Sequence, residues 1–352
     1  MLLSKLFKLK KQMKILVTGG LGFIGSHTAV ELQEAGYEVV IIDNCSNASE
    51  SVLDGIEAIA GKRPVFEKFD LRNREKVREF FKKYPDLSGV IHFAASKAVG
   101  ESVDEPLLYY ENNLTTLVSL LQELEKKQRA HFIFSSSCTV YGQADTMPIT
   151  EDAPVKPAES PYGNTKQIGE EIIRDTCKVR DQLQAISLRY FNPIGAHPSG
   201  RIGELPLGVP QNLVPFITQT AAGIRKQLSV FGDDYPTPDG TCIRDYIHVV
   251  DLARAHVVAL ERLLSGNNDA NYEIFNVGTG KGSSVMEVIR SFERVSGVAL
   301  NYKIVGRRPG DITEAYADTT RANEVLGWKA ESSLDDAMRS AWAWEQEIRK
   351  AE

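Results

Sequence analysis

Tyr162 and Lys166 stand four residues apart, a spacing that places two side chains on one face of a helix. A phenol with an ordinary pKa of about 10 is a poor base at neutral pH. A lysine ammonium beside it stabilises the phenolate and brings the pKa of the phenol toward the range where a general base works. Ser160-Pro161 is a plausible helix start just before the pair. The sequence therefore suggests a proton-transfer pair, although ordinary amphipathic surface helices show the same spacing.

Ser135-Ser136-Ser137 closes an apolar segment that we expect to be a buried strand. Polar residues at the carboxyl end of a parallel strand face the ligand-binding edge of the sheet. One of these hydroxyls is therefore a candidate to orient a substrate alcohol beside Tyr162. The alternative is a serine-rich turn without a ligand.

A glycine-rich segment from Thr18 to Gly25 follows the first expected strand and precedes the first expected helix. It contains G-x-G-x-x-G at Gly20, Gly22 and Gly25. Glycines permit a tight turn and a close approach of the backbone to a pyrophosphate at the positive end of the helix. The motif is weak alone, but the strand before it and the helix after it favour a dinucleotide site over a turn without a ligand.

Asp43 ends the second expected strand, where a carboxylate accepts hydrogen bonds from the adenosine ribose and repels a 2′-phosphate. The following residues, 44–48, contain no Lys or Arg to hold such a phosphate. These observations predict NAD rather than NADP. Asp70, at the end of the third expected strand, is a candidate partner for the adenine amine or, equally, a strand-end cap.

Short apolar segments alternate with segments of helical periodicity over the first half of the chain. This alternation is typical of an α/β fold with a doubly wound parallel sheet, whose ligands bind at the carboxyl ends of the strands. The expected strands are Lys14 to Thr18, Glu38 to Asp43, Val65 to Asp70, Gly89 to Ala95, His131 to Ser136 and Leu183 to Arg189, and the main expected helices are Ser26 to Ala35, Arg74 to Lys83, Leu107 to Lys127 and Tyr162 to Arg180.

The composition changes after Phe191, where residues 192–240 are rich in Pro and Gly. We predict a dinucleotide-binding domain of residues 13–191 plus about 241–264. A smaller carboxy-terminal α/β substrate domain would comprise residues 192–240 plus about 265–352, with a final helix around Leu334 to Ile348 and a cleft against the first domain. Residues 1–12 alternate Leu and Phe with Lys and are expected to be a disordered extension.

Composition narrows the class of protein. The chain has 352 residues, of which 42% are hydrophobic and 25% charged, as in ordinary globular proteins. Its formal net charge of -6 argues against a nucleic-acid surface, and no apolar run is long enough to span a bilayer. The four cysteines form no CxxC pair, which favours the cytoplasm, and the histidines show no metal-ligand spacing.

The glycine loop with Thr18, Asp43, Ser137 and the Tyr162 and Lys166 pair together resemble the extended short-chain dehydrogenases, which have a Rossmann fold. Longer segments resemble the UDP-glucose (UDP-galactose) 4-epimerases within that family. These segments are Lys97 to Ser102, Ser135 to Tyr141, Arg189 to Pro193, Gly195 to Gly200 and Arg244 to His248, and the resemblance runs from about Met13 to near the carboxyl end.

The resemblance implies an NAD-dependent enzyme that inverts the 4-position of a UDP-hexose through a transient 4-keto sugar. Tyr162 would take the proton of the 4-hydroxyl, with Lys166 and Ser137 as its catalytic partners. The resemblance also implies a homodimer, formed through the helices Leu107 to Lys127 and Tyr162 to Arg180. The cofactor positions that it implies are Gly19, Gly22, Phe23, Ile24, Gly25, Asp43, Asn44, Asn47, Ala48, Asp70, Leu71, Phe93, Ala94, Ala95, Lys97, Asn112, Ser137, Tyr162, Lys166 and Phe191. The UDP-sugar positions are Ser137, Tyr162, Asn192, Asn212, Leu213, Ser229, Val230, Phe231, Arg244, Arg308, Asp311 and Ala315, with Arg307 as an alternative to Arg308.

One position bears on the choice of sugar. In the family, a bulky tyrosine four residues after the Asp311 position accompanies simple hexoses, and a small residue accompanies tolerance for N-acetylated sugars. Ala315 stands there, so we expect UDP-N-acetylglucosamine to be accepted as well as UDP-glucose.

Two other functions share parts of this pattern. Sugar-nucleotide 4,6-dehydratases resemble Thr-Asp-Glu where this chain has Ser137-Cys138-Thr139, which lacks the carboxylates that water elimination needs. A non-catalytic NAD-binding sensor would not need the Tyr162 and Lys166 pair.

Overall fold

The computed structural model describes residues 10, 12–308 and 311–350. The chain divides into two compact units. The first comprises Met1–Gly142, Pro154–Arg189 and Ala253–Phe275, and the second comprises Gln143–Ala153, Tyr190–Leu252 and Asn276–Glu352. Apart from Lys10 and Gln12, the expected amino-terminal extension lies outside the described residues.

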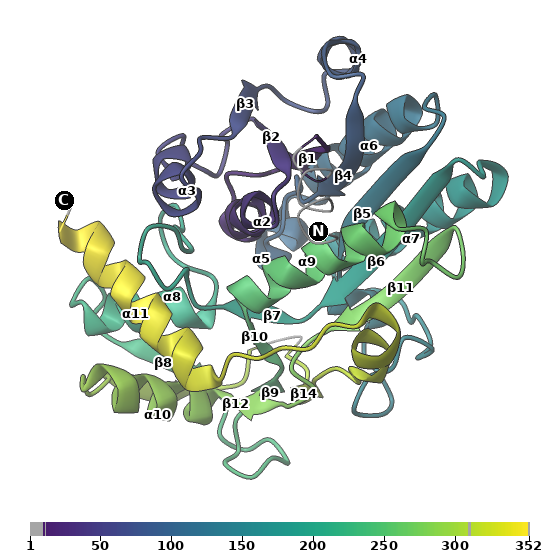
Figure 1. The fold of residues 1–352 in the computed structure, drawn as a ribbon. Helices are drawn as coiled ribbons and strands as arrows, with labels where there is room; N and C mark the ends of the chain where they lie inside the picture. The colour runs from purple at the N-terminus through teal and green to yellow at the C-terminus, as the bar shows by residue number, and fades with distance from the viewer. Residues whose placement is uncertain (1–9, 11, 309–310, 351–352) are drawn as a thin grey trace. The chain divides into compact units, whose positions relative to one another are not determined.

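The first unit is built on a seven-stranded sheet in the order β11-β6-β5-β4-β1-β2-β3 (Figure 1). Strand β1 pairs in parallel with both β2 and β4, β2 with β3, and β4 with β5. The chain therefore leaves β1 in one direction along the sheet and later returns to its other side, which confirms the doubly wound parallel sheet. The strands are β1 (Lys14–Thr18), β2 (Glu38–Asp43), β3 (Val65–Lys68), β4 (Leu87–His92), β5 (Ala130–Ser137), β6 (Leu183–Tyr190) and β11 (Tyr272–Val277).

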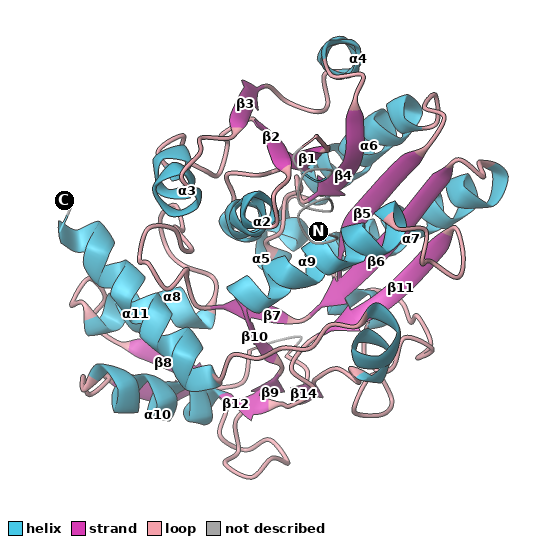
Figure 2. Cartoon of the chain, viewed as in Figure 1, coloured by secondary structure: helices cyan, strands magenta, loops and turns pink. Residues whose placement is uncertain are grey.

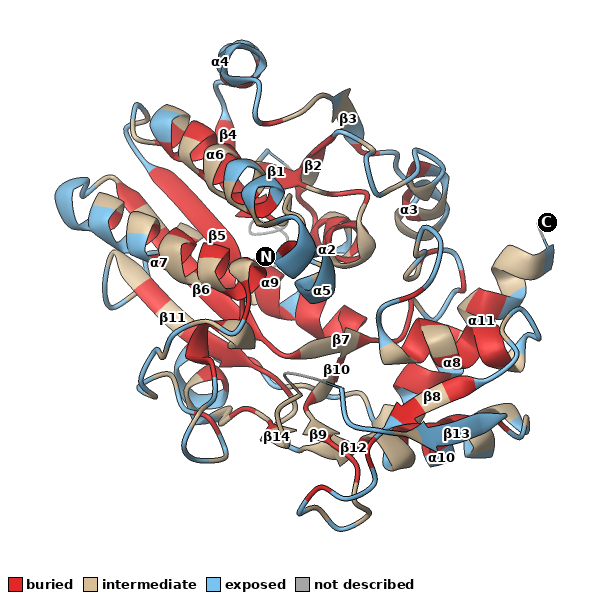
Figure 3. Ribbon diagram, turned by 180° about the vertical axis from the view of Figure 1, so that it is seen from behind, coloured by how far each residue is buried: buried red, intermediate tan, exposed pale blue. Residues whose placement is uncertain are grey.

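Helices cover both faces of this sheet. Figure 1 shows α2 and α9 in front of the strands, and the reverse view in Figure 3 shows α6 and α7 on the opposite face. This two-sided cover explains why the central strands are buried apolar runs rather than alternating ones. The helices are α2 (Phe23–Glu34), α3 (Val52–Ala60), α4 (Arg74–Lys83), α5 (Val99–Asp104), α6 (Pro106–Leu124), α7 (Pro161–Val179) and α9 (Val249–Leu264).

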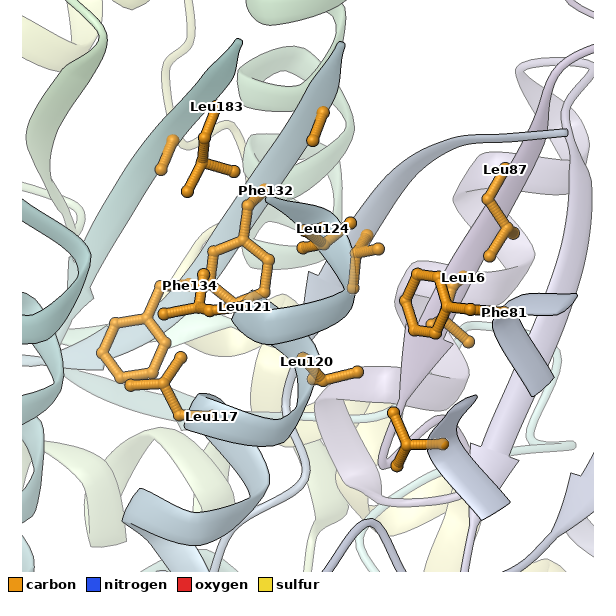
Figure 4. Close-up of a cluster of buried hydrophobic side chains, with 14 of the residues drawn as sticks. Leu16, Phe81, Leu87, Leu117, Leu120, Leu121, Leu124, Phe132, Phe134 and Leu183 are labelled. Carbon is orange, nitrogen blue, oxygen red and sulfur yellow. The ribbon is translucent and has the colours of Figure 1, made fainter. Parts of the chain in front are cut away.

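An apolar core under α4 and α6 holds these layers together (Figure 4). Leu117, Leu120, Leu121 and Leu124 are spaced at helical intervals on α6, so they form one stripe that packs on the sheet. Phe132, on β5, is fully buried in this core.

In the part of the chain that the structure describes, the second unit contains short strands and the α-helices α8, α10 and α11 (Figure 2). Its apolar core includes Ile217, Met338 and Phe292, one from each helix. Within the described residues, the sheets have the orders β10-β7, β12-β9-β14 and β13-β8. The elements are β7 (Asn192–Ile194), α8 (Leu213–Ala221), β8 (Leu228–Phe231), β9 (Ile243–Arg244), β10 (Tyr246–His248), β12 (Ser283–Ser284), α10 (Val285–Ser296), β13 (Tyr302–Val305), β14 (Glu314–Ala315) and α11 (Leu334–Lys350).

Strand β11 and helices α3 and α5 of the first unit were not predicted from the sequence. Strand β11 lies at the edge of the large sheet, whereas the sequence analysis grouped residues 265–352 with the second domain. Its six residues carry no signal that tells which sheet they join, because its partner β6 lies far upstream. Helix α3 has apolar residues at helical spacing, at Leu53, Ile56 and Ala60, so the sequence did contain a local signal for it. None of the described helices combines the length and apolar character needed to cross a membrane.

Candidate active site

The glycine loop joins β1 to α2, and steric contacts demand glycine at two of its positions. Gly19 has a φ of +65°, and a Cβ there would lie 2.7 Å from the backbone nitrogen of Ala94. A Cβ on Gly25 would lie 2.8 Å from the Cα of Gly20. Gly22 is the N-cap of α2 and places no side chain before the helix, whose first turn contains no acidic residue. A Cβ on Gly20 would also lie 2.7 Å from the Ile41 side chain. The bare backbone at a positive helix end fits a pyrophosphate.

Asp43 fastens this loop to the end of β2. Its Oδ2 accepts a hydrogen bond from the Leu21 backbone nitrogen at 3.1 Å, and its Oδ1 accepts one from Cys45 at 2.9 Å. Burial raises the pKa of the Asp43 carboxyl, and the backbone donors oppose this shift. The carboxylate therefore lies beside the glycine loop, at the position where the sequence predicts a ribose contact.

Asp70 lies two residues beyond the end of β3, which stops at Lys68. Its Oδ2 accepts from Arg72 Nη2 at 2.8 Å and from Asn44 Nδ2 at 3.2 Å. The Arg72 guanidinium lowers the pKa of Asp70 to about 2. The side chain thus joins the loops that follow β2 and β3. Of the other predicted positions in these loops, Asn47 is exposed, Ala48 half-buried and Leu71 buried.

Helix α7 begins where the sequence predicts. The Ser160 side chain accepts a hydrogen bond from the Gly163 backbone nitrogen at 3.1 Å, which caps the helix, and Pro161 occupies its first turn. Tyr162 and Lys166 are 9% and 4% exposed, so neither is a surface residue. The surface-helix interpretation of the pair is therefore wrong.

The Lys166 ammonium lies within reach of the tyrosine. Its Nζ is 5.7 Å from the centroid of the Tyr162 ring and 5.0 Å from that of Phe134. It donates a hydrogen bond to the Ser135 carbonyl at 2.6 Å. Burial lowers the pKa of Lys166 to about 8, and the charge of Glu170 opposes this shift. The site thus holds a poorly solvated cation close to a phenol, as a stabilised phenolate requires.

Ser137 is the last residue of β5 and is 6% exposed. Its Oγ accepts a hydrogen bond from the Thr139 backbone nitrogen at 3.2 Å and caps the short 3₁₀ helix Cys138–Tyr141. A Cβ on Gly163 would lie 3.4 Å from the Cβ of Thr139, so this turn packs on the first turn of α7. The structure therefore brings the Ser137 segment alongside the Tyr162 helix.

The segment that follows β4 is held by α6. Asn112 Nδ2 donates to the Ser96 hydroxyl at 3.1 Å, and Asn113 Oδ1 accepts from the Ser96 backbone nitrogen at 2.8 Å. Asn113 Nδ2 also donates to Thr165 Oγ1 at 3.0 Å, which links this segment to α7. Among the predicted cofactor positions of this segment, Phe93, Ala94 and Ala95 are half-buried and Lys97 is exposed.

Two polar residues at the site, Asn113 and His92, were missed in the sequence. The His92 ring nitrogen Nδ1 lies 2.7 Å from Thr18 Oγ1. Burial, and after it the charge of Lys166, lowers the pKa of His92 to about 3, so the ring is neutral. No motif marks either residue, because their partners come from neighbouring strands and helices distant in sequence. The only available signal was a polar residue on an otherwise apolar buried segment.

In the second unit, a carboxylate lies between two of the predicted arginines. Asp311 Oδ1 is 2.7 Å from Arg308 Nη2 and 3.8 Å from Arg244 Nη2. The Arg308 guanidinium also lies 5.6 Å from the centroid of the Phe231 ring. Ala315 is buried and pairs in register with Arg244 between β14 and β9. These five predicted residues therefore form one cluster.

Arg307 faces a different set of groups. It donates to the Asp234 carboxylate at 2.7 Å, and its guanidinium lies 4.0 Å from the centroid of the Tyr235 ring. This geometry favours Arg308 over Arg307 as the residue of the predicted cluster.

The remaining predicted substrate positions lie on separate elements of the second unit. Asn212 immediately precedes α8, which begins at Leu213, and its Nδ2 donates to Glu204 Oε1 at 2.7 Å. Asn192 begins β7, and Ser229 and Val230 lie on β8 with Phe231. Phe191, predicted for the cofactor, falls in the second unit and not with the other cofactor positions.

The fold and the residues at the strand ends define a dinucleotide-binding enzyme of the short-chain dehydrogenase type. The family model described as GDP-mannose 4,6 dehydratase matches residues 16–341. A UDP-glucose 4-epimerase of Bacillus subtilis is 51% identical over 333 residues, covering 95% of this chain and 97% of that protein.

Comparison with solved structures leads to the same family. A UDP-glucose 4-epimerase from Stenotrophomonas maltophila with bound NAD and formylated UDP-arabinopyranose has a TM-score of 0.93 at 45% identity, covering 97% of this chain and 100% of that one. One from Bifidobacterium longum in complex with NAD+ and UDP has a TM-score of 0.91 at 44% identity, with the same coverage. The chain belongs to the UDP-glucose 4-epimerase family of extended short-chain dehydrogenases.

Proposed function

We propose that this protein is an NAD-dependent UDP-hexose 4-epimerase that acts through a 4-keto sugar. The observation that carries the proposal is the buried pair of Tyr162 and Lys166 beside the Ser137 segment, in the unit that also contains the glycine loop. Its relatives are UDP-glucose 4-epimerases over nearly their full length.

The first unit fits a dinucleotide. Gly19, Gly22 and Gly25 would hold its pyrophosphate, and Asp43 would accept from its adenosine ribose. Bound NAD would supply a reversible hydride acceptor for the sugar C4. Asp43 also disfavours the extra phosphate of NADP.

The residues of the chain then transfer the proton and orient the sugar. Tyr162, as the phenolate, takes the proton of the 4-hydroxyl, and Ser137 holds that hydroxyl toward it. Lys166 stabilises the phenolate through its charge. After the 4-keto sugar has turned to present its opposite face, Tyr162 returns the proton to the oxygen. The return of the hydride to this opposite face of C4 would invert its configuration.

The nucleotide has to stay bound while the sugar turns. Arg244 and Arg308 are proposed to hold the diphosphate, where charge-assisted hydrogen bonds suit a guanidinium. Asp311 would accept from the uridine ribose. The clustering of these three side chains supports the assignment.

The substrate range is proposed to include N-acetylated sugars, because Ala315 contributes only a methyl group at its position. Proton NMR of the protein mixed separately with UDP-glucose and UDP-N-acetylglucosamine, without added NAD, tests both proposals. Formation of both galacto products is expected. Turnover of UDP-glucose alone would contradict the wider range and leave the epimerase, and turnover of neither, even with added NAD, would overturn the epimerase.

The matched variant is Ala315→Tyr, which should keep turnover of UDP-glucose and lose that of the N-acetylated sugar. Equal loss of both activities would show that position 315 does not select between the two sugars.

We further propose a cytoplasmic homodimer. All four cysteines are free, which suits a reducing compartment. Val103, Leu107 and Leu108, on α5 and α6, are exposed by 60%, 80% and 40%, and apolar side chains gathered on a surface favour association. Light scattering after size exclusion should give twice the chain mass.

A further inference from the structure

A buried ion pair lies behind the proposed catalytic residues. Arg189, at the end of β6, donates to Glu170 on α7 through two bonds, Nε to Oε1 at 2.9 Å and Nη2 to Oε2 at 2.5 Å. The two side chains are only 4% and 5% exposed. Buried pairs of this kind generally contribute little net stability compared with apolar residues of similar volume. A role beyond stability would account for charges at this place.

Glu170 connects the two elements that carry the proposed catalytic residues. It lies one turn after Lys166 on α7, and its Oε1 accepts a hydrogen bond from Ser136 Oγ at 2.5 Å. Ser136 stands on β5 between Ser135, whose carbonyl accepts from Lys166, and Ser137. One carboxylate therefore ties the end of β5 to the helix of Tyr162 and Lys166.

Glu170 also sets the charge around Lys166. Among the residues that the structure describes, it is the carboxylate identified as opposing the burial effect on the pKa of Lys166. His92, which faces Lys166 from β4, stays neutral because burial lowers its pKa to about 3. The other titratable groups around the pair are Tyr162 on α7, Tyr141 with its ring 4.7 Å from the Arg189 guanidinium, and Tyr272 on β11, whose pKa is raised by burial and by Glu170.

We propose that Glu170, clamped by Arg189, is a positioning residue that keeps the Ser137 hydroxyl and the Lys166 ammonium in register with the Tyr162 phenol. It acts through these residues and does not itself contact the reacting atoms. The inference rests on the proposed epimerase function for its kinetic readout.

The test compares Glu170→Gln with the double variant Glu170→Gln/Arg189→Met. The single variant keeps the shape but leaves Arg189 uncompensated, so both Lys166 and Tyr162 should lose protons more readily. Both limbs of the pH profile of kcat should then move to lower pH, by about two units for a unit charge at one helical turn and an effective dielectric constant of about 20. The double variant removes both charges and should bring the limbs back toward their native positions.

Glu273→Gln is the matched control. Glu273 pairs with Arg262 in the same two-bond manner, at 2.8 Å and 2.9 Å, and its side chain is 2% exposed. That pair contacts none of the proposed catalytic residues through the bonds described. The control variant should lower the melting temperature but leave both limbs of the pH profile of kcat unchanged.

A second readout does not depend on turnover. The apparent pKa of Tyr162, taken from tyrosinate absorbance as the difference from Tyr162→Phe in each background, should fall in Glu170→Gln and recover in the double variant. The proposal would be overturned if Glu170→Gln and the double variant lost kcat equally, with no shift in either limb of the pH profile or in the apparent pKa of Tyr162. Glu170 would then be only a structural residue. If the native protein turned over no UDP-sugar, the epimerase proposal would fail while the titration still decided the role of Glu170. If Glu170→Gln did not fold, the double variant alone would decide the question. An apparent pKa of Tyr162 equal to the native value would support the argument that Glu170 and Arg189 balance each other's charge, and a different value would refute it.

Discussion

Removal of the Lys166 charge tests the central electrostatic argument. The Nζ lies 5.7 Å from the centroid of the Tyr162 ring. At an effective dielectric constant of about 20, a unit charge at this distance stabilises a phenolate by about 3 kcal/mol, or about two pKa units. Lys166→Met keeps the length and tolerates the contact with Phe134, so the fold should persist.

The expected result is a change in the shape of the pH profile. At pH near 7 the phenolate fraction, and with it kcat for UDP-glucose, should fall by about 100-fold. The native activity should decline above about pH 8, where Lys166 loses its proton, whereas the activity of Lys166→Met should rise with pH until Tyr162 ionises. The measurement is kcat by coupled assay at saturating substrate across this range.

Lys178→Met is the control, because Lys178 is an exposed residue near the end of the same helix. It should leave the profile unchanged. A loss of kcat in Lys166→Met that is the same at every pH would refute the reasoning and leave Lys166 only a structural or cofactor-binding role.

Three further predictions concern binding. Gly25→Ala would place a Cβ against the backbone of the glycine loop and should abolish retention of NAD, measured by the absorbance of the cofactor released on denaturation. The control Gly306→Ala, at a position with open space around it, should retain NAD, and equal retention in both variants would contradict the argument that the loop requires glycine at position 25. Arg308→Ala should weaken UDP binding by at least tenfold in calorimetry, and Arg307→Ala by much less, since Arg307 is paired elsewhere; the reverse order would disprove the assignment. Asp43→Asn should raise the affinity for NADP relative to NAD, and an unchanged ratio would show that Asp43 does not select the cofactor.

The sheet could be predicted well where strands are buried on both sides. The runs Lys14–Thr18 and Glu38–Asp43 were predicted to the residue, because continuous apolar segments end abruptly at glycine or at polar residues. Strand β3 was predicted too long, since the apolar pattern continues to Phe69 after the ladder has ended. The edge strand β11 has no such local signature.

The candidate active site, like the sheet, could be predicted only where its residues form local patterns. The Tyr162 and Lys166 pair and the glycine loop are local patterns, so sequence spacing was sufficient to find them. The pairing of Glu170 with Arg189 joins a helix to a strand and has no pattern in the sequence. The choice between Arg308 and Arg307 likewise required the structure, because adjacent charges differ only in the direction of their side chains.

The order of the strands also bears on how the chain is made. The sheet of the first unit is completed by β11, and Leu260 of α9 packs against Gly89 on β4, yet β11 and Leu260 both come after the long segment 190–252 of the second unit. During synthesis, β6 therefore remains an unpaired edge of apolar residues until residues 191–271 have emerged and β11 can follow. Domains generally fold as units during translation. Here the first unit cannot complete its core until residues 253–275 have been synthesised.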